Sequence, residues 1–168
     1  MKRLASTAIA IVLAAAFAAG AQAADKKKLY FVVNVPSDFW KAAEAGVKKA
    51  QGELPNYDLA LKYPEQGTVA IQSRLIDDLI AGGAAGIMVS PEDAKTESDY
   101  LNKVGSQVAL FTTDSDAPKT SRIVYIGSSN ALAGGQAAEI ALKALPDGGK
   151  CVGYVGLLGA DNARDRIQ

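Results

Sequence analysis

Short apolar runs alternate with longer amphipathic segments along the chain. The apolar runs are predicted to be strands, over residues 29–33, 57–63, 86–89, 108–112, 123–126 and 150–156. Helices are predicted over residues 39–53, 68–82, 90–104 and 131–145, and a last one from residue 161 onward. Because the strands are nearly continuous in apolar residues, the alternation predicts an α/β fold in which helices flank a parallel β-sheet.

Residue types at the predicted helix ends support these boundaries. Thr68 is a favourable N-cap for the second helix, and Gly82-Gly83 is suited to end it. Ser90-Pro91 is predicted to open the third helix, with Pro91 at the first helical position.

The N-terminal residues have the layout of a secretory signal peptide. Basic Lys2-Arg3 precedes an apolar run of 16 residues, and small residues follow at Ala21 and Ala23. The run is shorter than the roughly 20 residues of a membrane-spanning helix. We therefore expect residues 1–23 to be cleaved and the protein to be periplasmic.

Composition excludes several classes of function. Without residues 1–23 the chain has 16 basic and 18 acidic residues, so no nucleic-acid partner is expected. The absence of histidine removes His-based acid–base chemistry and His metal sites. Cys151 is the single cysteine, lies in an apolar run and is expected to be buried. We predict no metal and no cofactor.

The candidate site lies where three predicted strands end. In open α/β sheets, ligands bind outside the carboxyl ends of the strands. Residues 34–40, 90–93 and 113–116 follow the first, third and fourth strands. Residues 157–166 would face a ligand only if a second domain folds over the first.

Enzymatic and nucleotide-binding functions have little support in these segments. The turn after the first strand lacks the glycines of a dinucleotide fold, and no Walker lysine motif occurs. Asp114 and Asp116 form a carboxylate pair, but a polar turn explains them and no partner base accompanies them. We therefore predict that the protein is not an enzyme.

Binding of a sugar agrees better with the residue types. A sugar is held by polar groups on its hydroxyls and by aromatic rings on its C–H faces. The polar candidates are Asn34, Ser37, Asp114 and Ser115, and the aromatic ones are Phe39 and Trp40. Phe39 is equally explained as the first residue of a buried helical stripe with Ala43, Val47 and Ala50. Trp40 lies one position off that stripe, which favours ligand contact.

The order and spacing of several motifs resemble the ribose-type periplasmic sugar-binding proteins, the type I solute-binding proteins of ABC importers. The matching stretches are residues 32–46, Ile87-Met88-Val89-Ser90-Pro91, residues 113–118, residues 125–134 and Asn162-Ala163-Arg164-Asp165-Arg166. Ser115 stands where the ribose-binding branch has an arginine, so the resemblance implies a sugar or polyol rather than ribose itself.

The resemblance implies two α/β lobes that close on a ligand. Residues 24–128 would form the N-terminal lobe with a hinge near Ser128, and residues 129–168 would begin a second lobe in a C-terminally truncated copy. Ligand contacts would come from the six residues above and from Arg164, reaching over from the second lobe. Sequence pattern alone explains Arg164 as a solvated residue at a helix start.

The expected function is that of a monomeric receptor that delivers a small sugar to the membrane permease of an ABC importer. The alternative on the same fold is a receptor for sugar or autoinducer sensing and chemotaxis. A sugar-responsive repressor is opposed by the signal peptide and by the lack of a helix-turn-helix motif. An extracytoplasmic hydrolase is opposed by the lack of a catalytic constellation.

Overall fold

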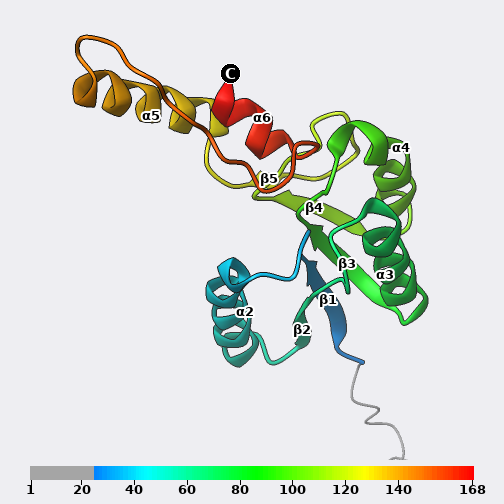
Figure 1. Ribbon diagram of the computed structural model, residues 1–168. Coiled ribbons are helices and arrows are strands. Elements are labelled where there is room, and N and C mark those ends of the chain that lie inside the picture. The colour runs from blue at the N-terminus through cyan, green and yellow to red at the C-terminus, as the bar shows by residue number, and fades with distance from the viewer. Residues whose placement is uncertain (1–24) are drawn as a thin grey trace, which may run out of the picture.

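The computed structural model describes residues 25–168, so the predicted signal peptide lies outside the described residues (Figure 1). The strands are β1 (Lys27–Val32), β2 (Tyr57–Lys62), β3 (Ala84–Val89), β4 (Ala109–Thr113) and β5 (Tyr125–Ile126). The helices are the short 3-10 helix η1 (Asp38–Trp40), α2 (Lys41–Glu53), α3 (Val69–Ala81), α4 (Ala94–Gly105), α5 (Asn130–Ala144) and α6 (Asp161–Ile167).

The five strands form one parallel sheet in the order β2-β1-β3-β4-β5. The predicted α/β fold with a parallel sheet flanked by helices is confirmed. Since all strands run the same way, the residues that follow β1, β3 and β4 meet at one edge of the sheet. The candidate site is therefore assembled from segments far apart in the sequence.

Alternate residues of the strands supply two separate cores, because successive side chains in a strand point to opposite faces. Helices α3 and α4 cover one face, and α2 lies on the other (Figure 1). The first core combines strand and helix residues: Val32, Ile76, Ala84, Ile87, Val89, Ala94, Leu101, Val104, Leu110 and Ala117. The second is smaller and centres on Phe31, Val33 and Trp40.

The face beneath α2 is only partly covered. An apolar hollow of ≈ 330 Å³ remains open there, between α2 and the middle of the sheet. Its floor includes Leu29, Met88 and Phe111, which alternate with residues of the first core.

Helix boundaries agree with the predictions at α3 and differ at α4. The Thr68 hydroxyl accepts a hydrogen bond from the Ile71 amide, and Gly83 after the helix has φ of 87°. Helix α4 begins at Ala94 rather than at Pro91, which corrects the predicted start. Asp93 is the N-cap because its carboxylate accepts from the amides of Lys95 and Thr96, two donors that a helix leaves unpaired.

The predicted sixth strand is wrong. Residues 150–156 have no strand pairing, and the Cys151 side chain is exposed rather than buried. A strand needs a neighbour for its backbone hydrogen bonds. This segment lies with α5 and α6 beyond the carboxyl edge of the sheet, where it meets no strand (Figure 1). Within residues 25–168, no helix has the length and apolarity needed to cross a membrane.

Candidate functional site

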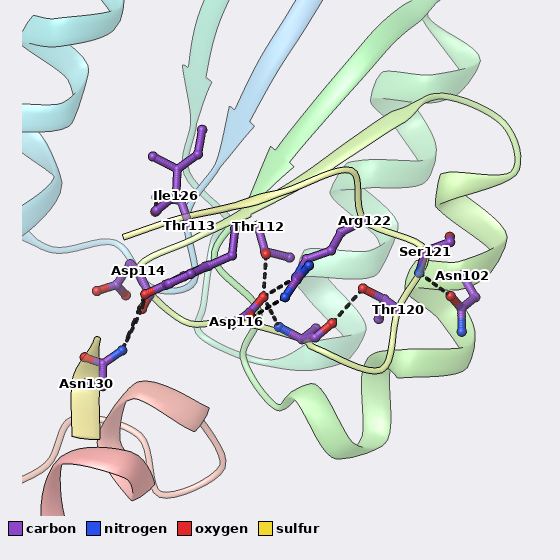
Figure 2. Close-up of polar contacts among 12 residues, drawn as sticks. Asn102, Thr112, Thr113, Asp114, Asp116, Thr120, Ser121, Arg122, Ile126 and Asn130 are labelled. Carbon is purple, nitrogen blue, oxygen red and sulfur yellow. Dashed lines mark hydrogen bonds and ion pairs between the residues drawn. The ribbon is translucent and has the colours of Figure 1, made fainter. Parts of the chain in front are cut away.

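Asp114 lies at the carboxyl edge of the sheet, beside the end of β3. It follows β4 directly and has φ of 59°, a left-handed conformation that aspartate adopts more readily than most residues. Its carboxylate Oδ2 accepts from the Ser90 hydroxyl at 3.1 Å. Its backbone oxygen accepts from the Tyr125 hydroxyl at 2.9 Å. It also accepts from Asn130 Nδ2 at 3.4 Å (Figure 2). Asp114 is therefore fixed from three segments.

Asn34 and Trp40 form a second fixed element, after β1. Asn34 Oδ1 accepts from the Val35 amide at 2.7 Å and from the Trp40 indole nitrogen at 3.2 Å. The Trp40 ring packs edge-on against Phe31, with centroids 5.5 Å apart. These contacts leave Asn34 Nδ2 without a hydrogen bond to any other residue of 25–168, so it can donate to a ligand.

In the structure Trp40 packs in the core and Phe39 is exposed, which is the reverse of the interpretation that placed Phe39 in the buried stripe and Trp40 off it. Trp40 is 4% exposed and belongs to the second core, whereas Phe39 is 68% exposed. The reason is the 3-10 turn that precedes α2, because it changes the helical phase. The stripe facing the sheet therefore runs through Trp40, Ala43 and Val47. Phe39 keeps an open aromatic face beside the site.

Five of the seven predicted site residues line one open hollow of ≈ 420 Å³. One wall comes from the segments that follow β1 and β4, the part predicted to form an N-terminal lobe, and consists of Asn34, Val35, Ser37, Phe39, Trp40 and Asp114. The facing wall comes from residues 154–157 and α6, and includes Tyr154, Asn162 and Arg166. We call this space the central hollow. A smaller adjoining hollow shares Phe39, Trp40, Asp114 and Arg166.

The segment leading into α6 lies directly against the residues that follow β4. The Asp161 amide donates to the Ser115 hydroxyl at 3.2 Å, and Ala160 is buried. Ser115 itself is fully buried and is absent from the lining of the central hollow. In this arrangement Ser115 contacts the α6 segment instead of the hollow.

Arg164 points away from the central hollow. Its guanidinium donates to the Gly159 carbonyl at 3.0 Å and pairs with the Asp161 carboxylate, in a different hollow beside Lys95 and Lys119. Arg166 lines the central hollow instead. Residues four apart share a helix face and residues two apart do not, so the spacing of Asn162 and Arg166 is the sequence signal for this face.

Asp116 has a structural role. The Arg122 guanidinium binds both carboxylate oxygens, with distances of 2.5 Å and 2.7 Å (Figure 2). Burial alone would raise the pKa of Asp116, but hydrogen bonds from Arg122, Thr112 and the Ala117 amide together hold it below its usual value. The carboxylate is thus committed to the loop after β4.

A buried glutamine ties together the strand ends that carry the site. Gln72 Nε2 donates to the carbonyls of Val33 and Ser90, each at 2.9 Å. These carbonyls adjoin Asn34 and precede the loop of Glu92. The contact fixes the ends of β1 and β3 relative to each other. Among residues 25–168, no group of three or more Asp, Glu or Cys side chains could hold a metal ion.

Comparison with known proteins identifies the family. A profile described as a periplasmic binding protein domain matches residues 29–168. The chain belongs to this periplasmic binding protein family. Together with the sugar-binding relatives described next, this match confirms the resemblance to ribose-type sugar-binding proteins.

Sugar-binding proteins are among the relatives with known function or structure. The ribose import binding protein RbsB of Escherichia coli (strain K12) is 26% identical over 167 residues, which cover 99% of this chain and 55% of that protein. An ABC transporter solute binding protein from Burkholderia graminis C4D1M, solved with D-arabinose, is 30% identical with a TM-score of 0.78, covering 85% of this chain and 50% of that one. The glucose-galactose binding protein GanP from Geobacillus stearothermophilus, at 24% identity, TM-score 0.77 and coverage of 84% and 51%, shares the fold. The chain spans about half the length of the curated relatives it matches.

Proposed function

We propose that this chain carries the N-terminal part of a sugar receptor of an ABC importer and that the central hollow receives a small sugar or polyol. The observation that carries the proposal is one hollow shared by an acidic side chain, Asp114, a free amide donor, Asn34, and an open aromatic ring, Phe39. Sugars require this combination. The relatives that bind or import sugars support the same class of ligand.

Each group would have a separate task. Asp114 Oδ1 has no hydrogen bond within residues 25–168, so it would accept from a ligand hydroxyl. Asn34 Nδ2 would donate to a second sugar oxygen, and Phe39 would cover a C–H face. Arg166 would approach from the opposite wall with several donors. No covalent step is involved, and the protein would act by binding alone.

Transport would use the two-lobe arrangement. Residues 24–128 would form the first lobe, and residues 129–168 would begin the second, with the hinge near Ser128. The ligand would favour the closed arrangement because it contacts both walls at once. A membrane permease would then recognise the closed, periplasmic receptor.

Calorimetric titration tests this function. The purified protein is titrated with D-ribose, D-arabinose, D-glucose and L-rhamnose, and at least one of them is expected to bind saturably. Asp114→Asn should weaken that binding by about 1–3 kcal/mol, because the acceptor that would meet a ligand hydroxyl is mismatched in the amide. Asp58→Asn is the matched control, since Asp58 is exposed near the start of β2. Binding of amino acids but of no sugar or polyol would contradict the proposed ligand class.

A further inference from the structure

The two carboxylate oxygens of Asp114 have different surroundings. Oδ2 accepts from Ser90 at 3.1 Å and from Asn162 Nδ2 at 3.0 Å. No residue of 25–168 donates to Oδ1. Since Asp114 also lines the central hollow, one oxygen is held by the protein and the other is left for another partner. Asn162 is the only one of these donors that comes from beyond the predicted hinge.

The Asn162 contact is part of a fitted interface. The neighbouring Asp161 amide donates to Ser115, and Ala160 is 2% exposed. At Gly159 an added Cβ atom would lie 2.9 Å from an Asp93 carboxylate oxygen, so a larger residue would require the Asp93 side chain to shift. Backbone contacts thus seat the segment, and Asn162 adds the single side-chain bond to the site.

We propose that Asn162 is a positioning residue of the binding site. It holds α6 against the N-terminal lobe in the absence of ligand, and it orients Asp114 so that Oδ1 faces the central hollow. The second role rests on the proposed function, whereas the first does not. Asn162 acts through Asp114, and no contact between Asn162 and the sugar is required.

The chemistry of the Asn162–Asp114 hydrogen bond determines which substitutions break it. The contact needs a donor at position 162, because the Asp114 carboxylate is an acceptor only. Asn162→Ala removes the donor. Asn162→Asp places a second carboxylate against the first, so repulsion should separate the two walls at neutral pH and fade as either group is protonated. Exchanging the two side chains, with Asp114→Asn and Asn162→Asp together, restores an amide beside a carboxylate.

The chain offers a direct readout that needs no ligand. Trp40 is the single tryptophan and lies in the N-terminal lobe, while Cys151 is the single cysteine, is exposed, and lies before α6. Energy transfer from Trp40 to an aminonaphthalene acceptor on Cys151 therefore reports how closely the α6 segment is held. Asn56→Asp is the matched control because Asn56 lies in an exposed turn before β2.

We expect Asn162→Ala to lower the transfer, and Asn162→Asp to lower it further at pH 7.5 with recovery toward pH 4. The double exchange should regain most of the transfer at pH 7.5, and Asn56→Asp should change nothing. Unchanged transfer in both single variants would overturn the proposal. So would a loss in Asn162→Asp that neither low pH nor the exchange restores, because a merely structural role predicts that result.

The role toward ligand is measured separately. In calorimetry, Asn162→Ala should weaken the affinity for the bound sugar about tenfold, the loss expected for one hydrogen bond to a charged group. Unchanged affinity would contradict the orienting role. If the unsubstituted protein bound no sugar, the proposed function would fail, while the energy-transfer result would still decide whether Asn162 holds α6.

Discussion

Residues 27–126 and residues 129–168 share an alternation of apolar and amphipathic segments, yet they are built differently. The first region closes a five-stranded sheet over two cores. In the second, large apolar side chains such as Leu142 and Tyr154 are exposed, and buried positions are confined to residues that contact the first region, such as Asn130 and Ala160. An apolar run therefore forms a strand only where another strand is available to accept and donate its backbone hydrogen bonds.

The candidate site lies where these two regions meet. The first region supplies a rigid edge of the sheet, with Asp114 and Asn34 fixed by hydrogen bonds. The second supplies a wall that is seated through a few contacts around Asn162. In the proposed function, the second wall is the one that would move when the two regions close on a ligand.

The largest difference between the regions is expected for matched leucine truncations. Leu101→Ala in α4 should lower the free energy of unfolding by about 2–5 kcal/mol, because it leaves a cavity in the first core. Leu142→Ala in α5 should change it by less than about 0.5 kcal/mol, since Leu142 is 70% exposed. Urea denaturation measures both. Equal losses would show that the second region has a core of its own.

A pH effect of intermediate size is expected from two buried glutamates of the first region. Burial, together with the charge of Glu97, raises the pKa of Glu92 to about 7, and burial raises the pKa of Glu97 to about 7. Because these values exceed the ordinary 4.5, the folded state binds more protons than the unfolded state between the two values. The stability that these two groups contribute should therefore be fully present below about pH 4.5 and be lost as the pH rises through 7, by about 1–3 kcal/mol.

Glutamine substitutions test whether these buried glutamates cause the pH dependence of the stability. Glu97→Gln keeps an acceptor for the Asp93 amide, which now donates to Glu97 at 3.0 Å, and should flatten the fall between pH 5 and 8. Glu139→Gln in α5 is the control, because Glu139 is exposed, and it should leave the pH profile unchanged. Denaturation midpoints over this pH range measure the effect. A profile unaltered by Glu97→Gln would locate the pH dependence elsewhere.

The smallest effect is expected for the glutamine that ties the strand ends. Gln72→Met should cost about 1 kcal/mol, because two carbonyls lose a donor while the unpaired buried Oε1 is also removed. Gln136→Met, on the exposed side of α5, should be neutral. Thermal denaturation is sensitive enough to compare them. A neutral Gln72→Met would mean that the ends of β1 and β3 do not depend on this bridge.

Sequence patterns predicted the first region well because helices lie on both faces of its sheet, so its strands are nearly continuous in apolar residues. The carboxyl-edge positions of Asn34, Ser37 and Asp114 followed from the parallel sheet alone. The segment at 150–156 could not be predicted in this way, because apolarity does not report whether a partner strand is present. The start of α4 was misplaced because Pro91 and Asp93 are both favourable at helix starts, and hydrogen bonding decided for Asp93.

Side-chain directions at the site depended on helical phase. Trp40 rather than Phe39 faces the sheet because η1 has three residues per turn. The prediction had assumed α-helical spacing from Phe39 onward. Arg164 was expected in the site from the family resemblance, whereas Arg166, four residues after Asn162, lines the central hollow. The exact ligand contacts of both arginines stay predictions.

In the proposed function, a sugar binds between Asp114 and the aromatic residues of the first region. Because the chain has one tryptophan, its indole N–H gives a single NMR resonance. This N–H donates to Asn34 Oδ1, and both residues line the central hollow. We expect this resonance to shift saturably when a binding sugar is added, and the same sugar concentrations to leave it nearly unmoved in Asp114→Asn. If a sugar bound by calorimetry but left the Trp40 indole resonance unshifted, it would not bind in the central hollow and the proposed site would be wrong.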